Sequence, residues 1–228
     1  ENIPNEYKNF KKIQKTLANC YFDTPKTSKL FKEILDEKKE DYSRYHFFFA
    51  NYLLSKNKKS VAIDTINFAS KEHPRNLLIN QYRQTLLKKE KNKNKFNCKV
   101  KAHILAEIFY VIANALSVQG NYELSNFYVN LSKYLNPNFL SYNSLLAENY
   151  AVLKKYNKSK KIYKMLSNLG SVYKWHADRQ TSFILDYQKE EKQALKFLKE
   201  SYDSITPDVY QTFDYANFLK DRKKYKSS

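Results

Sequence analysis

The sequence predicts an all-α protein built from repeated helical hairpins. Helix breakers are scarce, because the 228 residues include only two glycines and five prolines, and a chain of this composition favours helices over turn-rich architectures. One short phrase also recurs, in which a large apolar residue is followed by Ala, then Asn or Glu, then further apolar residues. The phrase reads FFFANYLL, YVIANALS, SLLAENYA and FDYANFLK, at residues 47–54, 110–117, 144–151 and 213–220.

The spacing of this phrase indicates a repeat. Its alanines are separated by 63, 34 and 69 residues, and three prolines are separated by 63 and 70 residues. A step of 34 and its near-doubles indicate a unit of about 34 residues. The alanines are Ala50, Ala113, Ala147 and Ala216, and the prolines are Pro74, Pro137 and Pro207.

With this period the sequence resembles the tetratricopeptide repeat (TPR) family, whose helix–turn–helix unit has small residues at positions 8, 20 and 27. Units that start at Ser43 and Ala106 match well, the unit at Leu140 lacks the expected proline, and Trp175 begins a looser unit. The residues at the small positions are Ala50, Ala62, Ala69, Ala113, Ser125, Ser132, Ala147, Ser159, Ser182, Ala194 and Ser201. The resemblance implies a right-handed TPR-type α-solenoid of stacked helix–turn–helix hairpins, in which each hairpin buries its apolar face against the next.

The helices follow from this register and from the breakers between them. We expect helices over 5–21, 26–40, 43–56, 59–72, 76–90, 100–118, 122–135, 139–154, 157–168, 172–187, 190–204 and 208–221. The run KKEKNKNKFNCKVK at 88–101 has no apolar period and is predicted to be a loop or extended segment. The expected organisation is an amino-terminal helical, TPR-like block (1–90), a basic joint (91–101) and a carboxy-terminal TPR block (102–228) that ends in an unpaired helix.

The candidate functional residues lie at position 9 of each unit, which the resemblance places in the concave groove of the array. Asparagine carries both a donor and an acceptor, so it can pair with a peptide backbone of any sequence. The alternative is a solvated helix face that only reflects an Asn-rich composition. Position 9 is Asn51, Asn114, Glu148, Asn217 and, in the looser unit, Phe183; nearby groove positions add Arg44, Phe47, Tyr110, Arg179 and Phe213.

Together these features favour a non-catalytic scaffold, of the bacterial TPR type, that binds an extended or helical segment of another protein. The formal net charge of +18 suggests nucleic acid as an alternative partner, but only five of the 41 basic residues are arginine, the side chain that phosphate and base recognition favours. A regulatory TPR module of a larger enzyme is a further alternative. Neither metal-ligand spacing among the histidines nor a phosphate-binding glycine loop is present in the sequence, so no cofactor, metal site or catalytic residue is expected.

Other expectations concern the cysteines, the termini and the compartment. Cys20 and Cys98 are far apart in sequence and are expected to be free thiols. No run of 18 apolar residues occurs, so no membrane span is expected. Residue 1 is Glu rather than Met, which is consistent with a removed leader or upstream domain and leaves cytoplasm and periplasm both open. The apolar final helix predicts further repeats or self-association.

Overall fold

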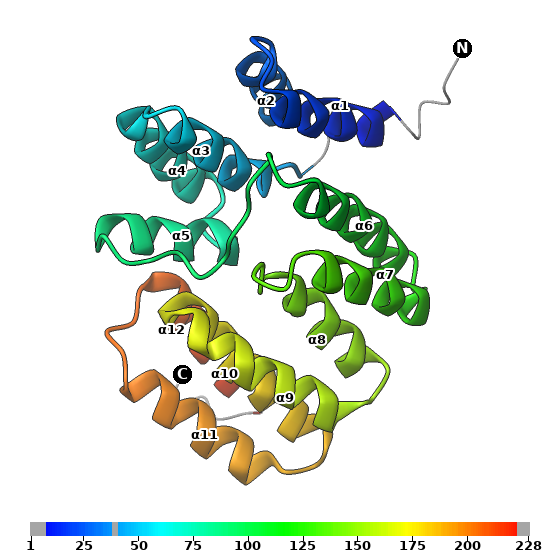
Figure 1. Ribbon diagram of the computed structural model, residues 1–228. Coiled ribbons are helices and arrows are strands. Elements are labelled where there is room, and N and C mark those ends of the chain that lie inside the picture. The colour runs from blue at the N-terminus through cyan, green and yellow to red at the C-terminus, as the bar shows by residue number, and fades with distance from the viewer. Residues whose placement is uncertain (1–7, 38–40, 223–228) are drawn as a thin grey trace. The chain divides into compact units, whose positions relative to one another are not determined.

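The computed structural model describes residues 8–37 and 41–222, and within these residues it consists of α-helices, one short 3-10 helix and connecting turns (Figure 1). Twelve α-helices were expected and twelve are present in the described part of the chain, so the predicted all-α class is confirmed. Residues 5–7 and 38–40 of the predicted helices lie outside the described residues. The helices are α1 (Lys8–Phe22), α2 (Thr27–Leu35), α3 (Tyr45–Ser55), α4 (Lys59–Glu72), α5 (Leu77–Leu87), α6 (Lys101–Val118), α7 (Tyr122–Leu135), α8 (Tyr142–Val152), α9 (Tyr156–Leu166), η2 (Ser167–Leu169), α10 (Ser171–Tyr187), α11 (Glu191–Asp203) and α12 (Val209–Lys220).

The chain divides into two compact units, Glu1–Leu145 and Leu146–Ser228. The boundary between them falls inside α8, whereas the predicted joint at 91–101 lies within the first unit. We therefore describe the two units separately.

Small side chains at positions 8 and 20 give both units their hairpin geometry. Two helices can cross closely only where short side chains meet, and all eight residues at these positions are fully buried. In two hairpins a serine hydroxyl at position 20 also donates to the alanine carbonyl at position 8, at 2.7 Å from Ser125 to Ala113 and 2.8 Å from Ser159 to Ala147. The predicted TPR-type register is thus confirmed. The eight residues are Ala50, Ala62, Ala113, Ser125, Ala147, Ser159, Ser182 and Ala194.

Each hairpin turns at a residue with left-handed backbone geometry. The second residue after the first helix has a positive φ in every one of these hairpins: 58° at Asn57, 79° at Gly120, 56° at Lys154 and 69° at Lys189. A residue of this kind closes the last turn of a helix and redirects the chain. Only one of the four is glycine, so the other three turns retain the conformational cost of a side chain at positive φ.

The same turn geometry identifies an incomplete unit. Lys89 follows α5 with a φ of 57°, yet the residues after it form no helix until α6 begins at Lys101. Counted from Arg75, position 8 of this unit is Tyr82, which is buried with its ring 4.7 Å from that of Phe47. A tyrosine at the crossing position blocks the close approach of a second helix. Helix α5 thus corresponds to the first helix of a hairpin whose second helix is absent from residues 88–100.

An extended segment, residues 91–100, takes the place of the missing helix, and we call it the strap. Its Phe96 ring lies 4.4 Å from Phe48, and Asn94 Oδ1 accepts a hydrogen bond of 2.9 Å from the backbone N–H of Ser141. Near its end, Cys98 forms a disulfide with Cys20 of α1, with the two Cα atoms 5.6 Å apart. The expectation of free thiols was wrong, because the fold brings together two cysteines that are 78 residues apart in sequence.

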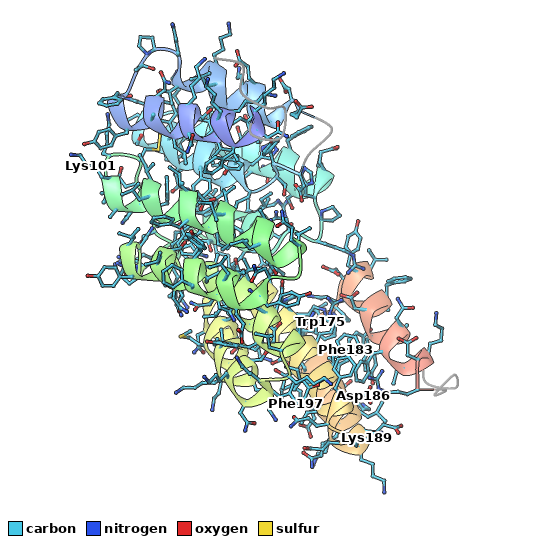
Figure 2. The ribbon with its side chains drawn as sticks, turned by 90° about the vertical axis from the view of Figure 1, so that its right-hand side faces the viewer. Lys101, Trp175, Phe183, Asp186, Lys189 and Phe197 are labelled. Atoms are coloured by element: carbon cyan, nitrogen blue, oxygen red, sulfur yellow. A yellow bond between two sulfur atoms is a disulfide. The ribbon has the colours of Figure 1, made fainter. Side chains whose placement is uncertain are left out.

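The second unit has its own core. Trp175 of α10 packs in a buried cluster with Ala194, Leu198 and Phe218, and Phe183 lies against the same cluster (Figure 2). Trp175 is thus a packing residue of the second unit. The final helix α12 begins with a capping box at Asp208 and buries Phe218 and Leu219.

Candidate functional site

A groove with a volume of about 430 Å³ lies between α1 and α6 in the first unit, and we call it the α1–α6 groove. The two helices run in opposite directions, so the beginning of α1 faces the end of α6 (Figure 1). The turn before α3 and the first residues of α3 complete the lining. Apolar side chains form much of the two walls; they are Phe10, Ile13, Val111, Ala115 and Val118.

Three of the predicted site residues converge on this groove. Arg44, Tyr110 and Asn114 all line it, although they come from two different repeat units. Asn114 is exposed, and its side-chain amide makes no hydrogen bond within the described residues. Its donor and acceptor can therefore be offered to a bound chain.

Arg44 is also engaged in contacts within the protein. Its guanidinium donates two hydrogen bonds to Glu107 of α6, at 2.7 and 2.9 Å, and the ring of Tyr110 lies 4.2 Å from its Cζ. Burial raises the pKa of the Glu107 carboxyl, while the positive charge of Arg44 opposes that rise. The Arg44 charge is already neutralised inside the protein, so Arg44 stabilises the floor of the groove rather than binding an anionic group.

The structure adds Tyr45, which sequence reasoning missed. Tyr45 lines the groove and is 4% exposed, and its hydroxyl is buried without a hydrogen-bond partner in the described part of the chain. Burial raises the pKa of this hydroxyl well above its usual value, so it stays protonated. Buried polar atoms are rarely left unpaired in native proteins, and an orphan beside a groove suggests a missing ligand atom. The repeat pattern gives no signal for this position.

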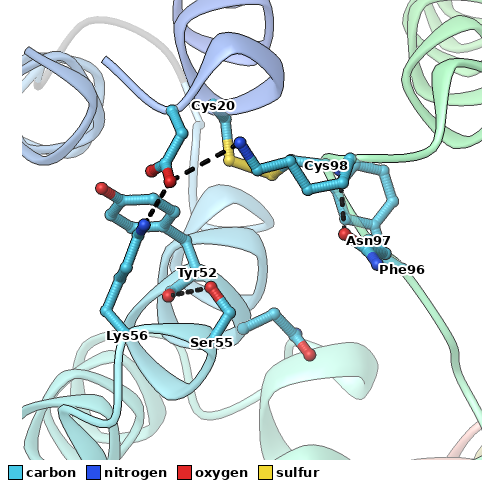
Figure 3. Close-up of a pocket in the computed structure, with 10 residues that line it drawn as sticks. Cys20, Tyr52, Ser55, Lys56, Phe96, Asn97 and Cys98 are labelled. Carbon is cyan, nitrogen blue, oxygen red and sulfur yellow. Dashed lines mark hydrogen bonds and ion pairs between the residues drawn. A yellow bond between two sulfur atoms is a disulfide. The ribbon is translucent and has the colours of Figure 1, made fainter. Parts of the chain in front are cut away.

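Asn51 and Phe47 do not belong to the α1–α6 groove. Asn51 lines a separate cavity of about 490 Å³ beside the disulfide (Figure 3). Its Nδ2 donates to the Phe47 carbonyl at 2.8 Å, and its Oδ1 accepts a long hydrogen bond of 3.4 Å from Tyr82. Phe47 is fully buried, so its predicted place in an accessible groove was wrong. The two position-9 asparagines of the first unit therefore face different cavities.

The charged candidates of the second unit are partly engaged within it. Arg179 Nη1 forms an ion pair of 2.7 Å with Asp214 of α12. Glu148 is half-exposed, and its Oε1 lies 3.9 Å from His176 Nε2. Burial lowers the pKa of His176 to about 4, so the imidazole is neutral at pH 7 and this contact is not an ion pair.

The remaining candidates of the second unit differ in exposure. Phe183 packs edge-to-face on Phe218 with the ring centroids 5.3 Å apart, which makes it a core-facing residue. Asn217 is half-buried, whereas Phe213 is 58% exposed on α12. Phe183, Asn217 and Phe213 therefore do not share one identifiable binding surface.

Among the described residues, one helix is long and apolar enough to span a membrane, by length and composition alone. Helix α6 has 18 residues with a mean hydropathy of 1.3. The sequence-based expectation rested on the absence of an unbroken apolar run, so it did not detect the high mean hydropathy of α6. A single helix of this kind is weak evidence, and α6 carries Glu107, which is paired with Arg44. Of its 18 residues, Ala106, Glu107 and Ala113 are buried and most of the others are half-buried.

Known proteins similar to this chain are found among solved structures. No family model matches the sequence, and no curated protein matches it. Among solved structures, TTC0263, a thermophilic TPR protein of Thermus thermophilus, is 13% identical with a TM-score of 0.42, over 92% of this chain and 98% of that one. A tetratricopeptide repeat protein of Parabacteroides merdae is also 13% identical with a TM-score of 0.42, over 94% of this chain and 87% of its own.

The hairpin register and the buried small positions define an α-helical repeat protein of the TPR type. Identities of 13% and TM-scores of 0.42 carry no argument about this chain, so its class and its function are argued from its own residues. Among the described residues, no group of three or more His, Cys, Asp or Glu is placed to hold a metal ion.

Proposed function

We propose that the protein is a non-catalytic interaction module that binds a segment of another protein in the α1–α6 groove. The observation that carries the proposal is the combination of apolar walls, exposed at Ala115 and Val118, with unpaired polar groups beside them. The apolar walls would be covered by side chains of the partner. The amide of Asn114 and the hydroxyl of Tyr45 would pair with its main chain.

The charges of the groove specify the chemistry of this segment. Arg44 is neutralised by Glu107, and the other charged residue of the described lining is Asp41, whose Oδ1 accepts a hydrogen bond of 2.9 Å from the Ser43 N–H. Among the described residues the lining contains no lysine, although the chain carries a net charge of +18. The favoured segment is therefore apolar, with a basic group near Asp41 and without acidic residues at its centre.

A matched pair of substitutions tests the location of the site. Peptides would be selected from a displayed random library against the purified chain, and their affinity measured by titration calorimetry. Val118→Asp places a charge in the groove at a residue that is 83% exposed, whereas Val209→Asp makes the same change on α12 at a residue that is 74% exposed. We expect affinity at least about tenfold weaker for Val118→Asp and unchanged for Val209→Asp, because burying an unpaired carboxylate is unfavourable. Equal affinity in the two variants would place the binding site elsewhere.

Tyr45→Phe tests the polar part of the proposal. The hydroxyl has no partner in the described part of the free protein, so its removal should not lower the free energy of unfolding. If a bound main chain satisfies the hydroxyl, peptide affinity should fall by about threefold to tenfold. Unchanged affinity would restrict the proposal to the apolar contact.

A further inference from the structure

The disulfide lies at the end of the α1–α6 pair opposite to the groove. Cys20 is two residues before the end of α1 at Phe22, and Cys98 is three residues before the start of α6 at Lys101. Because the helices are antiparallel, the groove is lined by the beginning of α1 and the end of α6. The disulfide thus links α1 to the last residues of the strap, at the end of the helix pair away from the groove.

Polar contacts among the described residues also join the end of α1 to its surroundings. Asp23, just after α1, forms ion pairs with Lys56 at the end of α3 and, at 3.6 Å, with Lys99 of the strap (Figure 3). Lys99 Nζ also donates a hydrogen bond of 3.0 Å to the Tyr21 carbonyl. The side chains of Lys56 and Lys99 are 37% and 52% exposed and that of Asp23 is 29% exposed, and ion pairs with this access to water contribute little to stability. The disulfide adds the covalent link between α1 and the strap.

A reductant can approach the disulfide. Both cysteines line the cavity of about 490 Å³ described above, and Cys98 is 8% exposed whereas Cys20 is 1% exposed. Attack is therefore expected at the Cys98 sulfur, which lies in the strap rather than on a packed helix. Lys56 and Lys99 line the same cavity, and nearby cations stabilise a departing thiolate.

We propose that the Cys20–Cys98 disulfide is a redox latch that holds the α1 wall in place, so that reduction loosens α1 and weakens binding in the α1–α6 groove. The binding part rests on the function proposed above. A dithiol reductant supplies the two electrons: its thiolate attacks Cys98 Sγ, the S–S bond breaks, and Cys20 leaves as a thiolate that takes up a proton. The second thiol of the reductant then displaces Cys98 from the mixed disulfide, which leaves two protein thiols and an oxidised, cyclic reductant.

Hydrogen exchange tests the latch without any ligand. Backbone amide exchange in α1 would be measured for the oxidised chain, for the same chain in dithiothreitol, and for the double variant Cys20→Ser with Cys98→Ser. Amides of α10 in the second unit serve as the internal reference. We expect α1 amides to exchange at least about tenfold faster after reduction and in the variant. Dithiothreitol should have no effect on the variant. Unchanged α1 exchange after complete reduction would overturn the latch, whether or not the groove binds a peptide.

Peptide affinity then tests the coupling to the groove. The peptide selected against the oxidised chain should bind the reduced chain at least about tenfold more weakly, with Val118→Asp as the negative control. Equal affinity in the two redox states would overturn the proposed control of binding, even if α1 becomes more mobile. If the oxidised chain binds no selected peptide, the proposed function is refuted, and the binding part of the latch is refuted with it. The hydrogen-exchange result would still decide whether the disulfide holds α1. Circular dichroism of each sample would verify that the helices remain folded.

Discussion

Glu107→Gln is expected to be among the most damaging single substitutions in the first unit. Glu107 is fully buried, accepts hydrogen bonds from Arg44 at 2.7 and 2.9 Å, and accepts a further bond of 3.3 Å from the Tyr142 hydroxyl. Removing its charge leaves the guanidinium of Arg44 surrounded by aromatic rings with no counter-ion. Breaking one side of a buried ion pair costs about 3–5 kcal/mol. Since glutamine keeps one acceptor oxygen, we expect a loss at the lower end of that range.

Urea unfolding followed by circular dichroism would measure this loss. The matched control is Glu72→Gln, the same change at an exposed glutamate of α4, where a shift within about 0.5 kcal/mol is expected. The cycle is completed with Arg44→Met and the double variant, which should lose less than the sum of the two single changes because the double variant leaves no buried charge alone. If Glu107→Gln unfolds at the same urea concentration as Glu72→Gln, the reasoning about a buried pair is refuted.

Two further predictions concern packing and pH. Ala113→Leu should lower the free energy of unfolding by about 1–3 kcal/mol, because the added volume enters a fully buried helix crossing. The exposed control Ala115→Leu should not, and equal midpoints in thermal unfolding would contradict the register. For His176, burial lowers the folded pKa from 6.5 to about 4, so the unfolded chain binds the proton more readily. The resulting stability is complete above about pH 6.5 and declines as the pH falls toward 4, by up to about 3 kcal/mol. His176→Gln should flatten the dependence of the melting temperature on pH over this range, and an unchanged slope would exclude His176 as its source.

The hairpins could be predicted from the sequence because their determinants are local and periodic. Ala50 and Ser125 lie at crossings where a short side chain is a steric requirement, so the repeat of small residues directly reports the geometry. The interruption was equally visible, because a run of Lys and Asn cannot supply a buried helix face.

The candidate site could be predicted only in part, because the incomplete unit changes which elements are neighbours. The register places Asn51 and Asn114 in one groove, but Tyr82 and the strap surround Asn51 instead. The Tyr45 hydroxyl is unpaired because of how α1, α3 and α6 pack around it, and no pattern along the sequence reports this. The disulfide likewise could not be predicted from the sequence, because it depends on the three-dimensional path of the strap.

The disulfide also makes the amino-terminal half of the chain a covalent ring. Residues 20–98 form a closed loop that contains α2, α3, α4 and α5. A protease that cuts once inside this loop produces two polypeptides that remain attached until a reductant is added, so a nicked molecule keeps its mass on a non-reducing gel. The ring can close only after residue 98 has been synthesised, when the helices it encloses have already been made.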